Sequence, residues 1–184
     1  MNNIIAVVGM CGSGKTTVTN YLEKQGWRKV YFGGLIIDSI RERGLTINPE
    51  NERIVRKEIR EKYGNAGHAI KLTPVIKQYL ETGNVVIDGL YSWSEYLYLK
   101  KEFNLQLHIL GIITNKKERY VRLIHRPERP LSLSDAENRD ITEIETLEKG
   151  GPIAIADYYI MNDSSIERLE SYVQQLVTDL ESLS

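Results

Sequence analysis

A short run of glycines that ends in a lysine and a threonine has the residue types and spacing of a phosphate-binding site. Residues 9–16 read Gly-Met-Cys-Gly-Ser-Gly-Lys-Thr and fit the pattern G-x-x-x-x-G-K-[ST]. Glycines let the backbone approach a phosphate closely, so that successive N–H groups can surround it. The lysine can reach the β- and γ-phosphates of a nucleotide, and the threonine hydroxyl can hold Mg²⁺. The run predicts a site for ATP and magnesium.

The residues on either side of this loop support that interpretation over a chance glycine turn. An apolar run, Ile4 to Val8, precedes the loop and predicts a buried parallel strand, and a helix-compatible stretch, Thr17 to Lys24, follows it. A helix N-terminus adds roughly half a positive charge to such a site. Cys11 is either a passive loop residue or an oxidation-sensitive thiol. We expect the donor phosphates to be held by Gly9, Cys11, Gly12, Ser13, Gly14, Lys15, Thr16 and Thr17.

One carboxylate is placed to complete the metal site. Asp88 ends the apolar run Val85–Ile87 and is followed by Gly89. Ligands of open α/β sheets bind at the carboxyl ends of the strands, so Asp88 is expected beside the phosphate loop. We predict that Thr16 and Asp88 serve the Mg²⁺ and that Asp88 also orients the acceptor. The alternative is that Asp88 caps the turn after the strand.

A basic segment follows later in the chain, and we interpret residues 115–140 as a lid. Arginines at 119, 122 and 126 have helical spacing and share one face. Phosphoryl transfer builds negative charge that bidentate arginines stabilise, and a closing lid excludes water. We predict catalytic roles for Arg122, Arg126 and Arg139, together with Lys15 and Asp88. The alternative is a solvated face of ion pairs, such as Arg139 with Glu143.

Residues 35–82 form an insertion of helical stretches with a mixed charge pattern. It separates two predicted strands and has the size of a small acceptor-binding subdomain. Acids surround its arginines, so a surface ion-pair face is the alternative for each of them. A tyrosine near Asp88 could stack on an acceptor base, or pack into the core with its aromatic neighbours. The candidate acceptor-binding residues are Asp38, Arg41, Arg56, Arg60 and Tyr91.

The elements that must position these residues alternate between strand and helix. This alternation predicts an α/β protein, a three-layer α/β/α fold with a five-stranded parallel sheet, in a single domain over residues 1–184. The predicted strands are Ile4–Gly9, Lys29–Phe32, Val85–Asp88, Gln106–Thr114 and Asp157–Met161.

Several helix ends are marked by capping patterns. Asn48 before Pro49 predicts a helix start, and three serines with a glutamate three residues later predict capping boxes. Gly150-Gly151-Pro152 predicts the end of a helix that begins near Asp135. The predicted capping boxes are Ser92-x-x-Glu95, Ser134-x-x-Glu137 and Ser164-x-x-Glu167.

The amino-acid composition limits the kinds of partner that we expect for this chain. The chain has 184 residues and a net charge of −1, which disfavours long nucleic acids as partners. No apolar run approaches the ~18 residues of a membrane helix. The one cysteine suits a reducing cytoplasm. We therefore expect a cytoplasmic protein, a monomer or homodimer, whose partner is a small nucleotide substrate and neither a membrane nor a nucleic acid.

These motifs together resemble the nucleoside monophosphate kinase branch of P-loop proteins. The chain is similar to adenylate kinase and dephospho-coenzyme A kinase, and most similar to small archaeal and bacterial P-loop proteins related to adenylate kinase. The resemblance implies that Gly12 to Thr16 hold the donor phosphates, that the lid arginines serve the transfer, and that Asp157–Asp163 lies near the donor adenine. It covers nearly the whole chain and rests on residues 8–15, 43–45, 49–51, 60–64, 87–89, 122–126, 139–140 and 155–163.

Two positions depart from the adenylate kinase pattern. Adenylate kinases carry an arginine in a Gly-Asp-x-x-Arg type motif after the second strand, and another two residues after the Asp-Gly of the third strand. Here these places hold Ile37 and Tyr91. Each missing arginine would remove charge-assisted bonds worth roughly 1.5–3 kcal/mol from an acceptor phosphate. Arg41, Arg56 or Arg60 can substitute, or the acceptor carries no phosphate there.

The sequence thus predicts an ATP- and Mg²⁺-dependent kinase whose acceptor is a nucleoside monophosphate or a related nucleotide. Dephospho-coenzyme A or a nucleoside is the alternative acceptor. A different class of function is a regulator that binds ATP, hydrolyses it slowly and signals by lid closure. The lid arginines disfavour this regulator, because a switch does not need so many transition-state charges. A polynucleotide kinase is disfavoured by the net charge.

Overall fold

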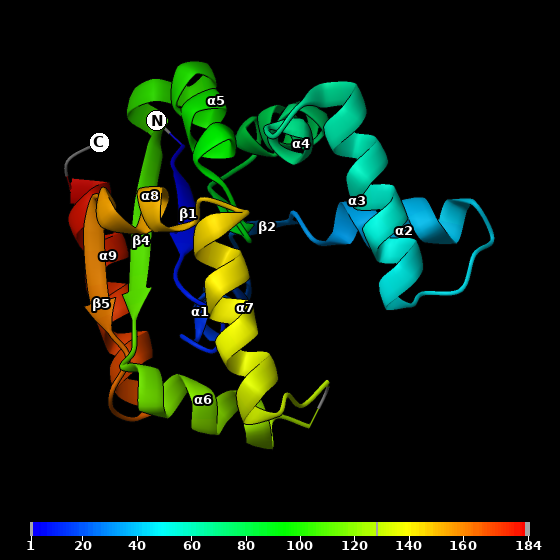
Figure 1. The fold of residues 1–184 in the computed structure, drawn as a ribbon. Helices are drawn as coiled ribbons and strands as arrows, with labels where there is room; N and C mark the ends of the chain where they lie inside the picture. The colour runs from blue at the N-terminus through cyan, green and yellow to red at the C-terminus, as the bar shows by residue number, and fades with distance from the viewer. Residues whose placement is uncertain (1, 128, 183–184) are drawn as a thin grey trace.

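The computed structural model describes residues 2–127 and 129–182 and is built on a five-stranded, all-parallel sheet (Figure 1). The spatial order is β2-β3-β1-β4-β5. All five predicted strands are confirmed to within about two residues at each end, because each was a short run rich in valine, isoleucine or tyrosine between helical patterns. The strands are β1 (Ile4–Val8), β2 (Arg28–Tyr31), β3 (Val85–Asp88), β4 (Leu107–Ile113) and β5 (Tyr158–Met161).

Helices cover both faces of the sheet, as the three-layer prediction requires. On one face, α1 (Lys15–Lys24) and α9 (Ile166–Ser182) bury an apolar cluster against Ile5 and Val7 of β1. On the other, α4 (Gly67–Leu80) and α5 (Trp93–Phe103) pack on Ile4, Ala6 and Val8. This alternation along β1 follows from the two-residue period of a strand, so both cores share the central strand.

The insertion between β2 and β3 contains two kinds of helix. Helices α2 (Gly34–Glu42) and α3 (Pro49–Tyr63) project sideways from the sheet (Figure 1) and share a small core of Ile36, Ile40, Val55 and Ile59. Helix α4 instead packs on the sheet through Ala69 and Ile76. The predicted cap of α3 is confirmed, because the Asn48 side chain accepts the Asn51 N–H at 2.8 Å. The part of residues 35–82 that stands apart is therefore α2 and α3.

Two of the three predicted capping boxes are displaced. The Ser92–Glu95 box is confirmed at the start of α5. Helix α7 (Leu133–Glu145) is capped by Ser132 with Asp135 rather than by Ser134 with Glu137, since aspartate also completes a capping box. Helix α9 begins at Ile166, and the Ser165 hydroxyl, not that of Ser164, accepts an N–H of its first turn.

The predicted stop of α7 at the glycine-glycine-proline sequence is also wrong. Helix α7 ends at Glu145, and residues 150–152 begin a short helix, α8 (Gly150–Ala154). Proline is tolerated in a first helical turn, where its missing N–H has no intrahelical partner to lose. The remaining elements are a 3₁₀ turn, η1 (Asn104–Gln106), and α6 (Lys116–His125).

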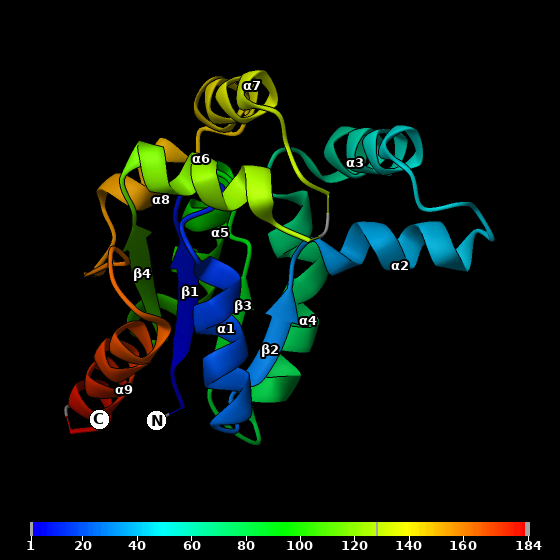
Figure 2. The same ribbon diagram turned by 90° about the horizontal axis from the view of Figure 1, so that it is seen from below.

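Helices α6 and α7 contain most of residues 115–140, the segment that we interpret as a lid, and we keep that name for the two helices. They lie side by side near the N-terminal end of α1 (Figures 1 and 2), and their contact is a small apolar cluster of Tyr120, Leu123 and Ala136 that Cys11 joins from the phosphate loop. Across residues 2–127 and 129–182, no helix has the length and apolar character to cross a bilayer.

Candidate nucleotide site

The phosphate loop adopts a backbone that only glycine tolerates at two positions. Gly12 and Gly14 have φ of 81° and 99°, in the left-handed region. A Cβ on Gly12 would lie 2.8 Å from the Arg119 carbonyl oxygen, and one on Gly14 would clash with the Asn162 amide. The two glycines therefore serve both the turn of the loop and its close packing against the lid and the end of β5.

Residues after β4 and β5 hold this loop in place. The Ser13 carbonyl oxygen accepts hydrogen bonds from Asn162 Nδ2 at 2.8 Å and from the Thr114 hydroxyl at 3.0 Å. Thr114 follows β4 and Asn162 follows β5, so the strand ends carry the loop directly. Asn162 belongs to the segment that the resemblance puts near the donor adenine. In this structure its side chain donates to the backbone of the phosphate loop.

Lys15 starts α1 and is held inside the loop. Its Nζ donates to the Met10 carbonyl oxygen at 3.0 Å. Burial and, after it, the positive charge of Lys149 lower the Lys15 pKa to about 8, although Glu143 acts in the opposite direction. The loop therefore presents a lysine whose environment favours loss of its charge, and an added phosphate would favour its retention.

The two predicted metal ligands face one cavity. Thr16 and Asp88 line a space of about 290 Å³ together with Lys29 and Tyr31. Asp88 is buried, and its Oδ2 accepts the Thr19 hydroxyl at 2.9 Å. A hydroxyl and a carboxylate in one cavity form an all-oxygen donor set of the kind Mg²⁺ takes alongside phosphate oxygens and water. These residues therefore fit the predicted ion.

Lys29 is a member of this cavity that sequence reasoning missed. Its Nζ lies 3.5 Å from Asp88 Oδ2 and bonds the Asn20 side chain at 2.5 Å. It comes from the edge strand β2, and the parallel pairing sets Tyr31 opposite Asp88 and Lys29 two residues earlier on the same face. The predicted ends of β2 and β3 do not specify how the two strands pair, so the sequence could not place Lys29 beside Asp88.

Arg119 ties the lid to the phosphate loop. Its guanidinium pairs with both carboxylate oxygens of Asp140 at 2.8 and 2.6 Å, and Nη1 also donates to the Cys11 carbonyl oxygen at 3.0 Å. The hydrogen bond to Asp140 raises the pKa of Arg119 despite its burial. This bidentate pair joins α6 to α7 and fixes both against the loop.

The three predicted lid arginines lie in different environments. Arg122 donates to the Asn162 carbonyl oxygen at 3.0 Å and approaches Gly14. Arg126 donates to the Arg129 carbonyl oxygen at 2.6 Å and so braces the loop after α6. Arg139 pairs with Glu143 at 3.3 Å, the ion-pair alternative, and stays half-exposed. Arg122 Nη1 would lie 3.9 Å from a Cβ on Gly14, so this arginine lies against the phosphate loop.

A buried ion pair next to the loop was also missed. Glu143 and Lys149 are each 1% exposed, and their charged atoms are 2.8 Å apart. Burial alone would raise the Glu143 pKa, but Lys149, Lys15 and Arg139 outweigh it and hold the pKa below its usual value. Nothing local in the sequence distinguishes these two residues from surface charges.

Arg56 and Tyr91 lie near each other and near Arg139 of α7. Burial, followed by the charges of Arg60 and Arg139, lowers the pKa of Arg56. Tyr91 sits under Lys149, whose Nζ lies 5.2 Å from the ring centroid, and burial raises the Tyr91 pKa. Arg56 and Arg139 come from α3 and α7, so this side of the insertion faces the lid.

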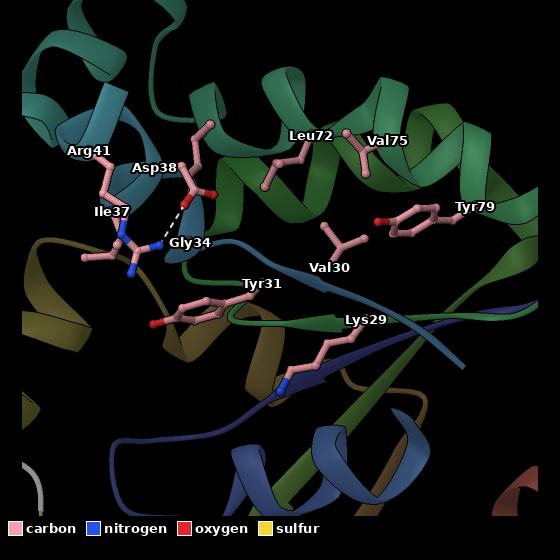
Figure 3. A pocket seen from close by; sticks show the side chains of 11 residues that line it. Lys29, Val30, Tyr31, Gly34, Ile37, Asp38, Arg41, Leu72, Val75 and Tyr79 are labelled. Atoms are coloured by element: carbon pink, nitrogen blue, oxygen red, sulfur yellow. Dashed lines mark hydrogen bonds and ion pairs between the residues drawn. The ribbon is translucent and has the colours of Figure 1, made fainter. Parts of the chain in front are cut away.

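Asp38 and Arg41 lie elsewhere. They pair with each other at 3.3 Å on α2, and both are exposed. They border a groove of about 550 Å³ between α2, the free edge of β2 and α4 (Figure 3). Ile37 lines the same groove. The five candidate acceptor residues thus divide between two places: Asp38 and Arg41 lie together at this groove, and Arg56 is close enough to Arg60 and Tyr91 to be affected by their charges.

The comparisons with known proteins agree with this geometry. The sequence model of a family described as "AAA domain" matches residues 5–146. UPF0200 protein TK1334 of Thermococcus kodakarensis is 32% identical over 181 residues, which are 96% of this chain and 97% of that protein. The chain belongs to the AAA-domain family and to the UPF0200 family. A UPF0200 protein of Sulfurisphaera tokodaii is 34% identical over 178 residues, 95% of each chain.

Several solved structures share the fold of this chain. TT1252 from Thermus thermophilus aligns with a TM-score of 0.68 at 20% identity, over 97% of this chain and 98% of that one. Shikimate kinase from Acinetobacter baumannii, solved with shikimate, aligns at 0.60 and 22%, over 97% and 94%. Dephospho-CoA kinase from Campylobacter jejuni aligns at 0.52 and 17%, over 97% of each. The predicted P-loop kinase fold is confirmed.

Proposed function

We propose that this UPF0200 protein is a kinase that uses ATP and Mg²⁺ to phosphorylate a small-molecule acceptor, most simply a nucleoside monophosphate or related nucleotide. The observation that carries this proposal is the convergence of Lys15, Thr16 and Asp88 beside a lid whose Arg119 bonds to the phosphate loop and whose Arg122 approaches Gly14. A protein that only binds nucleotide needs the loop, whereas transfer also needs charge on the lid side of the moving group.

Each residue has a defined part in this proposal. The loop amides and Lys15 bind the donor phosphates, and Thr16 and Asp88 hold Mg²⁺, which neutralises phosphate charge when bound. Arg122 lies next to Gly14 and stabilises the charge on the phosphoryl group. The lid covers the loop and excludes water, which would otherwise compete with the acceptor.

The acceptor is expected between α3 and α7. Arg56 already pairs with Glu52 at 3.7 Å, and Glu52 in turn pairs with Arg129 of the lid at 3.2 Å. An acceptor phosphate would replace Glu52 as the partner of Arg56. The absence of arginine at Tyr91, which lies buried under Lys149, favours dephospho-coenzyme A or a nucleoside as the second candidate acceptor.

The test is an ADP-release assay with ATP and Mg²⁺ across nucleoside monophosphates, nucleosides and dephospho-coenzyme A. We expect one acceptor class to raise turnover well above the acceptor-free rate in the parent protein. Asp88→Asn should lose this stimulation, whereas Asp179→Asn, on the exposed face of α9, should keep it. Tight ATP binding with a flat panel in the parent protein would contradict the kinase and favour a nucleotide-binding regulator.

A further inference from the structure

The buried pair of Glu143 and Lys149 lies against the phosphate loop and has no part in the functions assigned above. Burying two charges costs desolvation energy, and an apolar pair of similar volume often does as well or better. A buried ion pair is therefore weak as an explanation of stability. Of the charged groups around Lys15, Lys149 has the largest effect on the Lys15 pKa. The position of the pair next to this lysine indicates that the pair serves the nucleotide site.

Glu143 takes an N–H group of the loop itself. Its Oε2 accepts the Cys11 backbone N–H at 3.0 Å, and its Oε1 lies 2.8 Å from Lys149 Nζ. Cys11 is the third residue of the glycine-rich motif. A carboxylate that accepts a loop amide through one oxygen, meets Lys149 through the other and feels the charge of Lys15 has the surroundings of a bound phosphate group. Glu143 thus occupies an anion position in this structure.

Lys149 is fixed on the acceptor side of that position. Its Nζ lies 5.2 Å above the Tyr91 ring, and its backbone N–H donates to the Glu143 carbonyl oxygen at 3.0 Å. The junction behind it is close-packed, because a Cβ on Gly151 would meet the Trp93 ring at 2.6 Å. Lys149 is therefore a positioned cation between the phosphate loop and Tyr91.

We propose that Lys149 is a catalytic residue that binds the γ-phosphoryl group of ATP, and that Glu143 holds the place of this group until the nucleotide arrives. The proposal rests on the kinase function proposed above. When ATP binds, a γ-phosphate oxygen takes the Cys11 N–H and the Lys149 ammonium from the carboxylate. Glu143 then leaves the loop and keeps Arg139, its partner on the outer turn of α7.

The transfer step is balanced without a proton from either residue. The bond between the γ-phosphorus and the bridging oxygen breaks, and its electron pair stays on the β-phosphate of ADP. A bond forms between the phosphorus and an oxygen of an acceptor phosphate, which has no proton to lose. Lys149 keeps its protons throughout and offsets the charge that spreads over the three equatorial oxygens.

The decisive experiment compares binding of Mg²⁺-ADP with binding of the Mg²⁺ complex of the β,γ-imido analogue of ATP, by calorimetry and without acceptor. In the parent protein we expect the analogue to bind more tightly than ADP. Lys149→Met should leave ADP affinity within about twofold and weaken the analogue at least about tenfold, the value of one charge-assisted bond. A merely structural lysine would affect both nucleotides alike.

A second variant guards against misfolding. Lys149→Met leaves Glu143 buried without its partner, so Glu143→Gln/Lys149→Met removes both charges and keeps both shapes. The double variant should bind ADP normally and show no preference for the analogue. Lys117→Met, an exposed lysine of α6, is the matched control and should behave as the parent.

The outcomes separate the two proposals. A parent protein that binds neither nucleotide overturns the kinase function and this proposal with it. A parent protein that prefers the analogue, with the preference unchanged in both Lys149 variants, overturns only the role of Lys149. A parent protein that binds both nucleotides equally also overturns it, since no γ-phosphate contact would then exceed the contact with Glu143.

Discussion

Two arginine–carboxylate pairs of nearly equal length show how differently the two halves of this molecule are built. Arg119–Asp140 spans 2.6 Å beside the phosphate loop, with side chains 7% and 17% exposed. Arg43–Glu58 spans 2.7 Å between α2 and α3, with side chains 44% and 47% exposed. The first pair is largely shielded from water, where its attraction is stronger, and two further hydrogen bonds hold it. The second pair is exposed to water, where ion pairs contribute little to stability.

The difference extends to everything around the two pairs. The phosphate loop is bonded to the ends of β4 and β5 and to both lid helices. The α2–α3 pair has a core of four buried residues and reaches the lid through Glu52–Arg129, in which the arginine is largely exposed. We therefore expect a donor site whose backbone is preformed, so that only the Glu143 side chain moves when ATP binds, and an acceptor side that adjusts to its ligand.

The comparison is tested most strongly at the donor lysine. Lys15→Ala should lower kcat/KM by about 10² to 10³, the cost of removing one preorganised electrostatic contact to the transferring group. Lys24→Ala, at the exposed end of the same helix, should have no effect on turnover. Steady-state kinetics with saturating acceptor measures both. Full activity of Lys15→Ala would mean that the phosphates bind elsewhere.

Removing the arginine of each ion pair should change the free energy of unfolding by clearly different amounts. Arg119→Ala leaves Asp140 without its partner beside the loop and should lower the free energy of unfolding by about 3 to 5 kcal/mol. Arg43→Ala should leave the urea midpoint nearly unchanged, because water replaces the lost contact. Equal effects of the two substitutions would show that the two regions do not differ as their burial indicates.

The division also explains what the sequence could predict. The phosphate loop, Asp88 and the strands were readable because each depends on neighbours within about ten residues. Arg119 and Glu143 contact Cys11 across 108 and 132 residues, and no local pattern encodes such a contact. Arg119 and Arg122 lie on α6 as their helical spacing predicts, but Arg126 does not share their face, because α6 ends at His125 and Arg126 is extended and bonds its own connecting turn.

The acceptor residues illustrate the same limit. Arg41 and Arg56 looked equivalent, since each lies on a helix of the insertion among acidic neighbours. The packing of α2 against α3 decides that Arg56 turns toward Arg139 and Tyr91, while Arg41 borders the groove at the edge of β2. Such a choice follows from the crossing of two helices, which their separate periodicities do not specify.

A pair of substitutions on the insertion sharpens this assignment. Arg56→Ala should raise the KM for the acceptor about tenfold, the loss of one bond to a charged group, and leave the KM for ATP unchanged. Arg41→Ala should change neither constant. Initial rates with each substrate varied in turn distinguish the two. The reverse result would assign the acceptor to the groove lined by Asp38 and Arg41.

The smallest expected effect is the uptake of a proton when a nucleotide binds at the donor site. Binding at the acceptor side should take up none. The Lys15 pKa is about 8 in the folded protein against an ordinary value of 10.5. Between these pH values the unfolded chain binds more protons, so this lysine makes the free energy of unfolding rise with pH over that interval. Nucleotide phosphates favour the charged lysine, so binding of ADP at pH 9 should take up as much as one proton.

Calorimetry in two buffers with different ionisation enthalpies measures this uptake. The apparent binding enthalpy of ADP should depend on the buffer at pH 9 and much less at pH 7, where Lys15 already carries its proton. Lys15→Met should remove the dependence. Binding to the arginines of the acceptor side should show none, because Arg56 stays charged throughout this range even with its lowered pKa. Buffer dependence that persists in Lys15→Met would place the titrating group outside the phosphate loop and weaken the contrast between a preformed donor site and an adjustable acceptor side.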